Sequence, residues 1–481
     1  MTELKRRLGL FDATAIVTGS MIGSGIFIVS ADMARTLGSP GWLILAWVLT
    51  GIITLTAALS YGELAGMMPQ AGGQYIYLRE AFGKLPAFLY GWTLFTVIQS
   101  GTIAAVAVAF AKFTGVIFPI ISNSNWILKI CTVNGYNIGL NTENLLAIFS
   151  IIFLSWINTR GLDTGKWIQN IFTSTKIISL IGIIIIGITI GRNHTAIIHN
   201  LQNIWNASWI HTLPTFHIEK LNGLQILGAL GVAMVGSLFS SIAWDTVTYT
   251  AGETINPKKN IPLSLAIGTG IVTLLYILVN VSYLSVLPLH GNANGSDVFS
   301  RGIQFALNDR VGTASAQMIF GNSGAFIMAL LIMISTFGCN NGIILSTARV
   351  YYAMAKDGLF FKKAGGLNKN SIPEYALIIQ CIWSCLLCAT GTYSNLLDYV
   401  IFAVLIFYML TICGLIVLRI KKPKAERPYK AIGYPFIPLI YIFCATAISI
   451  DLLILKPLYT WPGLVIVLLG VPVYYIWKKQ N

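Results

Sequence analysis

A short run rich in glycine and serine interrupts the first apolar stretch of the chain. It reads Gly19-Ser20-Met21-Ile22-Gly23-Ser24-Gly25. Backbone groups that a helix frees at membrane depth need partners, so an unwound segment persists there only where protein packs around it or a cavity adjoins it. Freed N–H groups at the start of the next half-helix suit a carboxylate, and freed carbonyls suit an ammonium. The run therefore favours binding of a zwitterion, with close helix packing through small residues as the alternative.

A second irregular run lies in a later apolar stretch. It reads Phe239-Ser240-Ser241-Ile242-Ala243-Trp244-Asp245, with polar residues where a lipid-facing helix has none. Each of the two interrupted stretches stands first in a group of five. This is the pattern of inverted repeats whose interface holds a substrate. The alternative for Ser240 and Ser241 is hydrogen bonding back to their own helix.

Lys176 is the one basic residue deep inside an apolar stretch, FTSTKIISLIGIIII. Burying an ammonium without a partner costs several kcal/mol, so Lys176 must meet acceptors or lose its proton. It lies too far from either end of the stretch for its stem to reach the membrane interface. We expect it to act as a coupling charge or a proton carrier.

The elements that position these residues are membrane-spanning helices. The chain has 481 residues, 56% hydrophobic and 10% charged, whereas a soluble domain has about a quarter charged residues. Apolar runs of about 20 residues, long enough to cross a bilayer, recur along the chain. They predict an all-α membrane protein with twelve transmembrane helices, at 12–37, 41–68, 87–118, 143–160, 164–191, 224–250, 263–288, 321–356, 373–391, 394–418, 434–455 and 458–478.

The positive charge is explained by topology. A net charge of +14 would suggest a nucleic-acid partner in a soluble protein, but 22 of the 31 Lys and Arg residues fall on the side of the predicted bundle that holds both termini. This bias predicts that both termini are cytoplasmic and that the bilayer, not nucleic acid, is the partner. We expect Lys5-Arg6-Arg7 to precede a retained first span, since no cleavage site follows it.

The remaining polar residues indicate no cofactor and no metal. All five histidines lie in or beside the loops around 119–142, 192–223 and 289–320, and six of the seven cysteines lie in apolar segments. Segment 70–86 is amphipathic, which predicts a re-entrant or surface helix. Glu63, Glu80 and Glu253 lie near cytoplasmic helix ends. We expect them to contact arginines or backbone N–H groups as gate or scaffold residues.

Four motifs give the chain a family resemblance: GSMIGSGIF, YGELAGMMPQAGGQYIYLREAFG, WDTVTYTAGETINPKKNIPLSL and NNGIILSTARVYYAMAKDGLF. In order and spacing they resemble the L-type amino acid transporter (LAT) branch of the amino acid, polyamine and organocation (APC) superfamily. The resemblance implies one transporter domain over 1–481 with a LeuT-like 5+5 inverted-repeat core, in which helices 1 and 6 are broken. The repeats would span 12–191 and 224–418, with two peripheral helices at 434–478, and the protein would work by alternating access.

The resemblance also assigns site residues. It places the substrate carboxylate at Gly23, Ser24 and Gly25. It places the ammonium near carbonyls of Met21, Phe239 and Ile242, with Ser240 and Ser241 completing the substrate site. Phe239 matches an aromatic that covers the site from outside, and Lys176 stands where sodium-coupled relatives hold a sodium ion, so transport should be sodium-independent. Trp244 and Asp245 complete the predicted gate and coupling residues.

Two departures from the family pattern bear on the substrate. Ile242-Ala243 replaces smaller or acidic residues and Asp245 replaces asparagine. Because Ile242 fills volume, we expect a permease or exchanger for small or medium neutral L-amino acids in the plasma (bacterial inner) membrane. The alternatives are proton-coupled transport or exchange of cationic amino acids or polyamines and, more remotely, a nutrient sensor. No enzyme motif is found. The residues flanking Cys131 differ from the family pattern, so no heavy-chain partner is expected.

Overall fold

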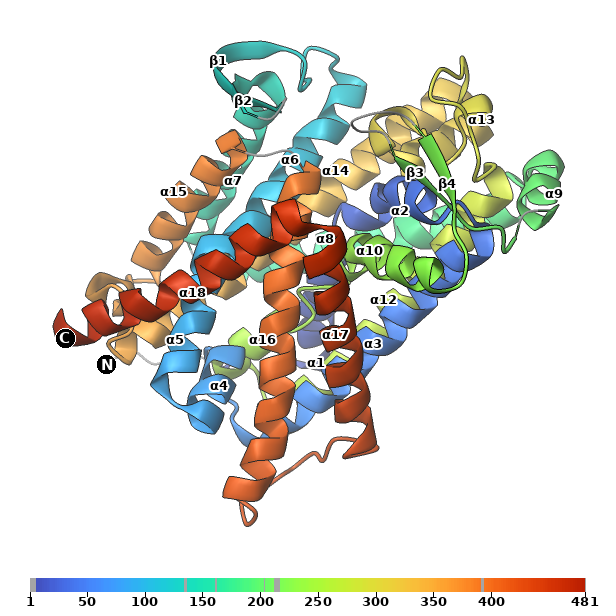
Figure 1. Cartoon of the computed structure of the whole chain (residues 1–481). Helices are drawn as coiled ribbons and strands as arrows, with labels where there is room; N and C mark the ends of the chain where they lie inside the picture. Colours follow the sequence, from blue (N-terminus) through green and yellow to red (C-terminus); the bar gives the residue numbers. More distant parts are fainter. Residues whose placement is uncertain are drawn as a thin grey trace.

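The computed structural model describes residues 6–480 except 134–135, 161, 203, 212–216 and 391–392. Helices dominate the fold (Figure 1). The first half contains α1 Leu10–Met21, α2 Val29–Leu37, α3 Pro40–Met67, α4 Gln74–Phe82, α5 Lys84–Thr93, α6 Gln99–Ile117, α7 Thr142–Asn158, α8 Leu162–Ile188 and α9 His194–Gln202. The second half contains α10 Leu224–Ser240, α11 Thr246–Tyr249, α12 Pro257–Val286, α13 Val298–Arg301, α14 Val311–Lys356, α15 Glu374–Thr390, α16 Tyr393–Lys421, α17 Phe436–Leu455 and α18 Pro457–Gln480.

Many of these helices are long and apolar enough for a membrane. Within the described residues, eight segments can cross a bilayer by length and composition, and four shorter apolar helices, among them α1 and α10, accompany them. The membrane character predicted from composition is therefore confirmed at this level. α1 and α10 are short because each ends at an interruption, and the other two shorter apolar helices are α7 and α15.

Both irregular runs, 19–25 and 239–245, coincide with helix interruptions. α1 ends at Met21, a single 3₁₀ turn covers Gly25–Phe27, and α2 begins at Val29. α10 ends at Ser240, and the chain resumes as the short α11 from Thr246. Between them Ala243 adopts a φ of 67°, which an alanine rarely adopts because its Cβ crowds the backbone.

Two features were not expected from the sequence. A helical segment that begins at Val311 precedes the predicted span 321–356 within α14, and Gly321, with φ 63° and ψ −151°, separates it from the rest at the residue where the span was predicted to begin. The polar loops contain two antiparallel hairpins, β1 Trp126–Val133 with β2 Tyr136–Asn141 and β3 Ser208–His211 with β4 His217–Lys220. Segment 70–86, predicted to form a re-entrant or surface helix, contains α4, and most of the residues of α4 are buried.

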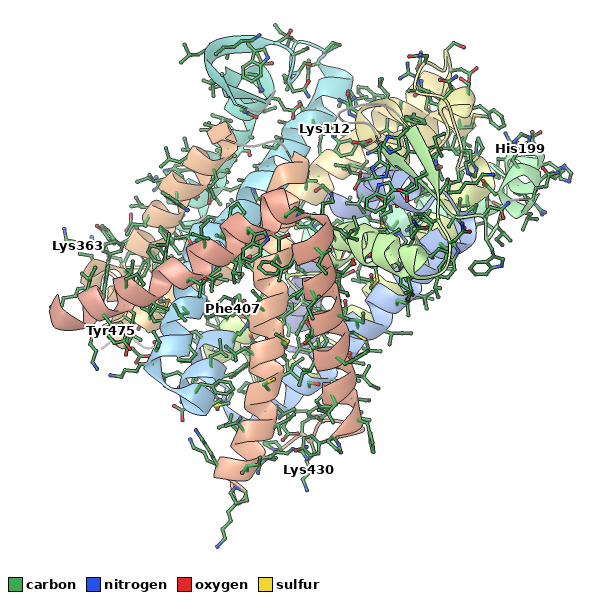
Figure 2. All side chains as sticks on the ribbon, viewed as in Figure 1. Lys112, His199, Lys363, Phe407, Lys430 and Tyr475 are labelled. Atoms are coloured by element: carbon green, nitrogen blue, oxygen red, sulfur yellow. The ribbon has the colours of Figure 1, made fainter. Side chains whose placement is uncertain are left out.

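The helices give the molecule two recognisable ends. One end carries β1–β2, β3–β4 and α13, and we call it the hairpin face; the other carries α4 and the connection between α16 and α17, and we call it the loop face (Figure 1). In Figure 2, Lys112 lies towards the hairpin face, Lys430 at the loop face, and Phe407 between them. The interrupted α1 packs against α8, α12 and α14, so its broken end is enclosed by protein.

Candidate functional site

The break after α1 frees four consecutive carbonyls, and side chains from three other helices take them. The Gly23 N–H turns back to the Met21 carbonyl at 2.8 Å, so the helical hydrogen-bond pattern ends there. The last carbonyls of any helix lack helical donors. The Gly19 carbonyl accepts a hydrogen bond from the Lys176 ammonium at 2.6 Å, and the Ser20 carbonyl accepts one from the Cys339 thiol at 3.1 Å. The Met21 carbonyl accepts from the Tyr276 hydroxyl at 2.9 Å, and the Ile22 carbonyl from the Ser335 hydroxyl at 3.4 Å. The surrounding protein therefore stabilises the unwound segment, as a break at membrane depth requires.

Tyr276 of α12 connects the two broken helices. Its hydroxyl oxygen lies 2.9 Å from the Met21 carbonyl oxygen and 3.0 Å from the Ser240 carbonyl oxygen. Met21 is the last residue of α1, and Ser240 is the last residue of α10. Its ring is buried and packs edge-on against Trp47, with centroids 5.4 Å apart. The hydroxyl has one proton, which it can donate to either carbonyl, so Tyr276 lies where the two interruptions meet.

The two breaks also touch directly. A Cβ placed on Gly25 would overlap Ser240, coming within 3.0 Å of its Cα, so only glycine fits there. A Cβ on Gly23 would approach the Cys339 sulfur to 3.1 Å. Ser240 also donates to the Gly236 carbonyl of its own helix at 2.9 Å. Close packing and hydrogen bonding within the helix, the alternatives to substrate binding at these two runs, therefore both occur. Close packing through small residues brings the two interruptions together.

Lys176 lies at the end of a row of polar contacts that fastens α8 to α1. Asn170 donates to the Asp12 carboxylate at 3.1 Å, Thr173 to the Ala15 carbonyl at 3.3 Å, and Lys176 to the Gly19 carbonyl at 2.6 Å. The Lys176 side chain is buried. The sequence required that Lys176 either meet an acceptor or lose its proton, and the structure provides an acceptor, the Gly19 carbonyl.

Asp245 and Trp244 lie in an aromatic cluster on α3, α5, α11 and α16. The Asp245 carboxylate accepts hydroxyl hydrogen bonds from Tyr249 at 2.5 Å and Tyr408 at 2.7 Å, and the Tyr249 hydroxyl lies 2.8 Å from that of Tyr90. The Trp244 ring packs 4.8 Å from Tyr61 and 5.0 Å from Tyr408, centroid to centroid. Each Asp245 oxygen therefore already has a donor.

Two small cavities adjoin Ile242. They measure about 20 and 10 Å³, and Tyr408 and Val404 also line both. A single water needs roughly 10–15 Å³ of such space, so neither holds an amino acid. Phe239, Ser241 and Ile242 are all buried, and Ser24 is as well. The site residues predicted from sequence are thus packed together in this conformation.

Several ion pairs connect neighbouring segments at the loop face. Glu63 accepts from Arg419 at 2.6 Å and Arg427 at 3.2 Å, and Glu253 pairs with Arg349 at 3.2 Å. These three contacts confirm that Glu63 and Glu253 contact arginines, as expected. Glu80 pairs mainly with Lys422 at 2.8 Å, and this hydrogen bond lowers the pKa of Glu80.

The N-terminal segment adds backbone contacts to the same end. The N–H of Leu8 donates to the Glu253 carbonyl at 3.0 Å, and the N–H of Ile255 donates back to Leu8 at 2.8 Å. The segment before α1 is therefore tied to the chain that follows the second interruption. Among the described residues, no group of three or more His, Cys, Asp or Glu side chains could hold a metal ion. The side chain of Cys131 lies outside the described residues.

The sequence alone does not predict the contacts that some of these residues make. Tyr276, Ser335 and Cys339 lie in ordinary apolar helices, and each is assigned a partner only by the packing of α12 and α14 on α1. The one available signal is polarity, since Tyr276 and Ser335 are polar groups inside membrane spans, which need partners.

Known proteins with similar sequences identify the family of the chain. The chain is 30% identical over 476 residues to the human large neutral amino acids transporter small subunit 2, covering 98% of this chain and 80% of the relative. It is 28% identical to the mouse b(0,+)-type amino acid transporter 1, covering 98% and 88%. It is also 28% identical to the Bacillus subtilis (strain 168) serine/threonine exchanger SteT, covering 99% and 98%. The family model described as amino acid permease matches residues 8–473. The chain therefore belongs to the amino acid permease family of the APC superfamily, whose members here are transporters and not enzymes.

Proposed function

We propose that the protein is a sodium-independent exchanger of small or medium neutral L-amino acids that works by alternating access. The observation that carries the proposal is the meeting of two broken helices at Gly25 and Ser240, bridged by Tyr276. The backbone N–H groups around Gly23, Ser24 and Gly25 would bind the substrate carboxylate, and the carbonyls of Met21, Phe239 and Ile242 would bind the ammonium. Binding would require a conformation in which the Gly23 N–H and the Tyr276 hydroxyl no longer both donate to the Met21 carbonyl.

The topology that we propose follows the two interruptions. Each broken helix counts as one span, which gives twelve spans in two inverted repeats at 12–191 and 224–418 and peripheral helices at 434–478. The distribution of Lys and Arg supports a topology with both termini and the loop face in the cytoplasm and the hairpin face outside. The plasma membrane is the proposed location, and protons are an alternative coupling ion.

The substrate class rests on Ile242 and Asp245. Ile242 occupies volume beside the site, which supports a small or medium side chain. The Asp245 carboxylate is held by two tyrosine hydroxyls, which supports a structural role over recognition of a cationic side chain. The similarity to the serine/threonine exchanger SteT over nearly the full length of both chains supports exchange of small amino acids.

Reconstitution tests the proposal. We expect liposomes that contain the purified chain to take up radiolabelled serine or leucine, and to do so faster when unlabelled amino acid is present inside. Lysine and putrescine should compete weakly, and replacing sodium with choline should leave uptake unchanged. Absence of flux across a panel of neutral and cationic amino acids and polyamines would overturn the proposal.

Gly25→Ala should disable the contact between the broken helices. The added methyl group must displace Ser240, and such overpacking costs about 1–3 kcal/mol. We expect at least a tenfold loss of uptake and a lower melting temperature. The matched control is Gly270→Ala in α12, where a Cβ meets nothing within 4 Å. That variant should transport normally and gain up to about 1 kcal/mol. Equal uptake by both variants would show that the contact is dispensable.

A further inference from the structure

A single π-helical turn joins α5 to α6 and packs beside the second interruption. It covers Leu94–Ile98, and the Gln99 N–H donates to the Leu94 carbonyl, five residues earlier, where an α-helix uses the carbonyl four residues earlier. Single π turns within α-helices are rare and frequently mark functional sites. The extra residue rotates the side chains that follow it around the helix axis, so it changes the face on which Gln99, the first residue of α6, lies.

Gln99 lines the smaller of the two cavities beside Ile242. This cavity measures about 10 Å³, and its lining also includes Ala243 and Asp245 from the second interruption. Phe407, another residue of the lining, lies between the loop face and the hairpin face in Figure 2. The cavity therefore lies inside the molecule, between the π turn and the proposed substrate site.

The Gln99 amide is buried but is neither paired nor sealed. Gln99 is 4% exposed, and its amide makes no hydrogen bond within the described part of the chain. Unlike the Oε1 atom of Gln74, the amide is not closed off from free space. The other polar side chains of the lining already take part in hydrogen bonds: Gln74, Tyr90, Asp245, Tyr249 and Tyr408. Because an unpaired buried amide costs free energy, Gln99 is the group of this lining that is left to bind a further molecule.

We propose that Gln99 hydrogen-bonds a hydroxyl on the substrate side chain and so selects serine and threonine over apolar amino acids of the same size. A primary amide has both a donor and an acceptor, and a hydroxyl can accept from the one and donate to the other. An ammonium can only donate, and a methyl group can do neither. The inference rests on the proposed function and names the substrate class of that same site.

The size of the cavity adds a limit on the side chain. In this conformation the cavity has room for about one water molecule, so a substrate side chain enters only as the packing around Ile242 loosens. A hydroxyl on a short side chain asks for the smallest enlargement, because its oxygen takes up the volume of that water. Long side chains, polar or apolar, must displace Ile242 further.

Competition between amino acids of the same shape tests the inference in proteoliposomes. Threonine and valine differ only in that a hydroxyl of one replaces a methyl group of the other. We expect threonine to inhibit serine uptake at a concentration at least about fivefold lower than valine, because a site that hydrogen-bonds a substrate group rejects the analogue that lacks it. Equal inhibition by threonine and valine overturns the inference, and this measurement needs no variant.

Gln99→Met assigns the preference to the amide. Methionine keeps the length of the side chain and lacks the amide, so threonine and valine should inhibit this variant within about twofold of each other. The melting temperature without substrate should not fall, because the amide has no partner within the described residues to lose. A purely structural role would lower it. Gln99→Leu repeats the comparison with a second apolar side chain.

The matched control is Gln225→Met, which changes an exposed glutamine near the start of α10 and should keep the preference of the unmodified chain. If Gln99 binds only a buried water, Gln99→Met keeps that preference as well, and the inference is wrong. Flux without a change in preference would overturn this inference alone. An absence of flux in the unmodified chain would overturn the proposed function and this inference together.

Discussion

The Lys176→Met chain should insert and fold but lose at least about tenfold in uptake. Methionine fills a similar volume, and the α8 segment remains apolar enough to enter the bilayer. The lost contact is the hydrogen bond from a buried ammonium to the Gly19 carbonyl at 2.6 Å. Hydrogen bonds to charged groups contribute about 1.5–3 kcal/mol, which corresponds to roughly 10- to 100-fold in an equilibrium or a rate. The loss should fall on the unwound segment that we propose binds substrate.

A matched lysine separates this effect from a general loss of charge. Lys258 lies at the surface and pairs with Glu426 at 2.9 Å. Because exposed ion pairs contribute little, Lys258→Met should transport within about twofold of the unmodified chain. Counterflow in proteoliposomes, normalised to the amount of folded protein, provides the measurement. Normal flux in Lys176→Met would remove Lys176 from the mechanism.

The positions of the two helix interruptions could be predicted from sequence because their cause is local. Gly23 and Gly25 weaken the helix wherever they stand, and the structure places the breaks at the two runs that composition identifies. The predicted span 321–356 begins at Gly321, where α14 is broken, but the helical segment from Val311 that precedes the break was assigned to a polar loop. The hairpins also escaped prediction, since polar loops of this length have no strong alternation.

The partners of the freed carbonyls could not be predicted, because they depend on which helices meet. Tyr276 follows Met21 by 255 residues and Cys339 follows Ser20 by 319. Nothing in the local sequence of α12 or α14 specifies these pairings; only the packing of α1 between the two helices does. The same limit applies to Asp245, whose tyrosine partners lie on its own short helix and on α16.

Variants of the buried Glu253–Arg349 ion pair test whether this contact contributes to stability and to gating at the loop face. The two side chains are 3% and 1% exposed and lie 3.2 Å apart, between the segment after α11 and α14. Removing one partner from a buried ion pair leaves an uncompensated charge and costs about 3–5 kcal/mol. We therefore expect Glu253→Gln to unfold at much lower temperature than the unmodified chain. Glu426→Gln, which breaks the exposed pair with Lys258, should change stability by less than about 1 kcal/mol.

A double variant separates stability from gating. Replacing a buried ion pair with apolar residues is often neutral or stabilising, so Glu253→Leu with Arg349→Met should recover much of the lost stability. If the loop face must open during transport, the ion pair becomes hydrated in the open state, whereas two apolar side chains become exposed and oppose opening. The double variant should then be stable and slow, with uptake at least about tenfold below normal. Stable protein with normal uptake would mean that the pair holds the scaffold together and takes no part in the gate.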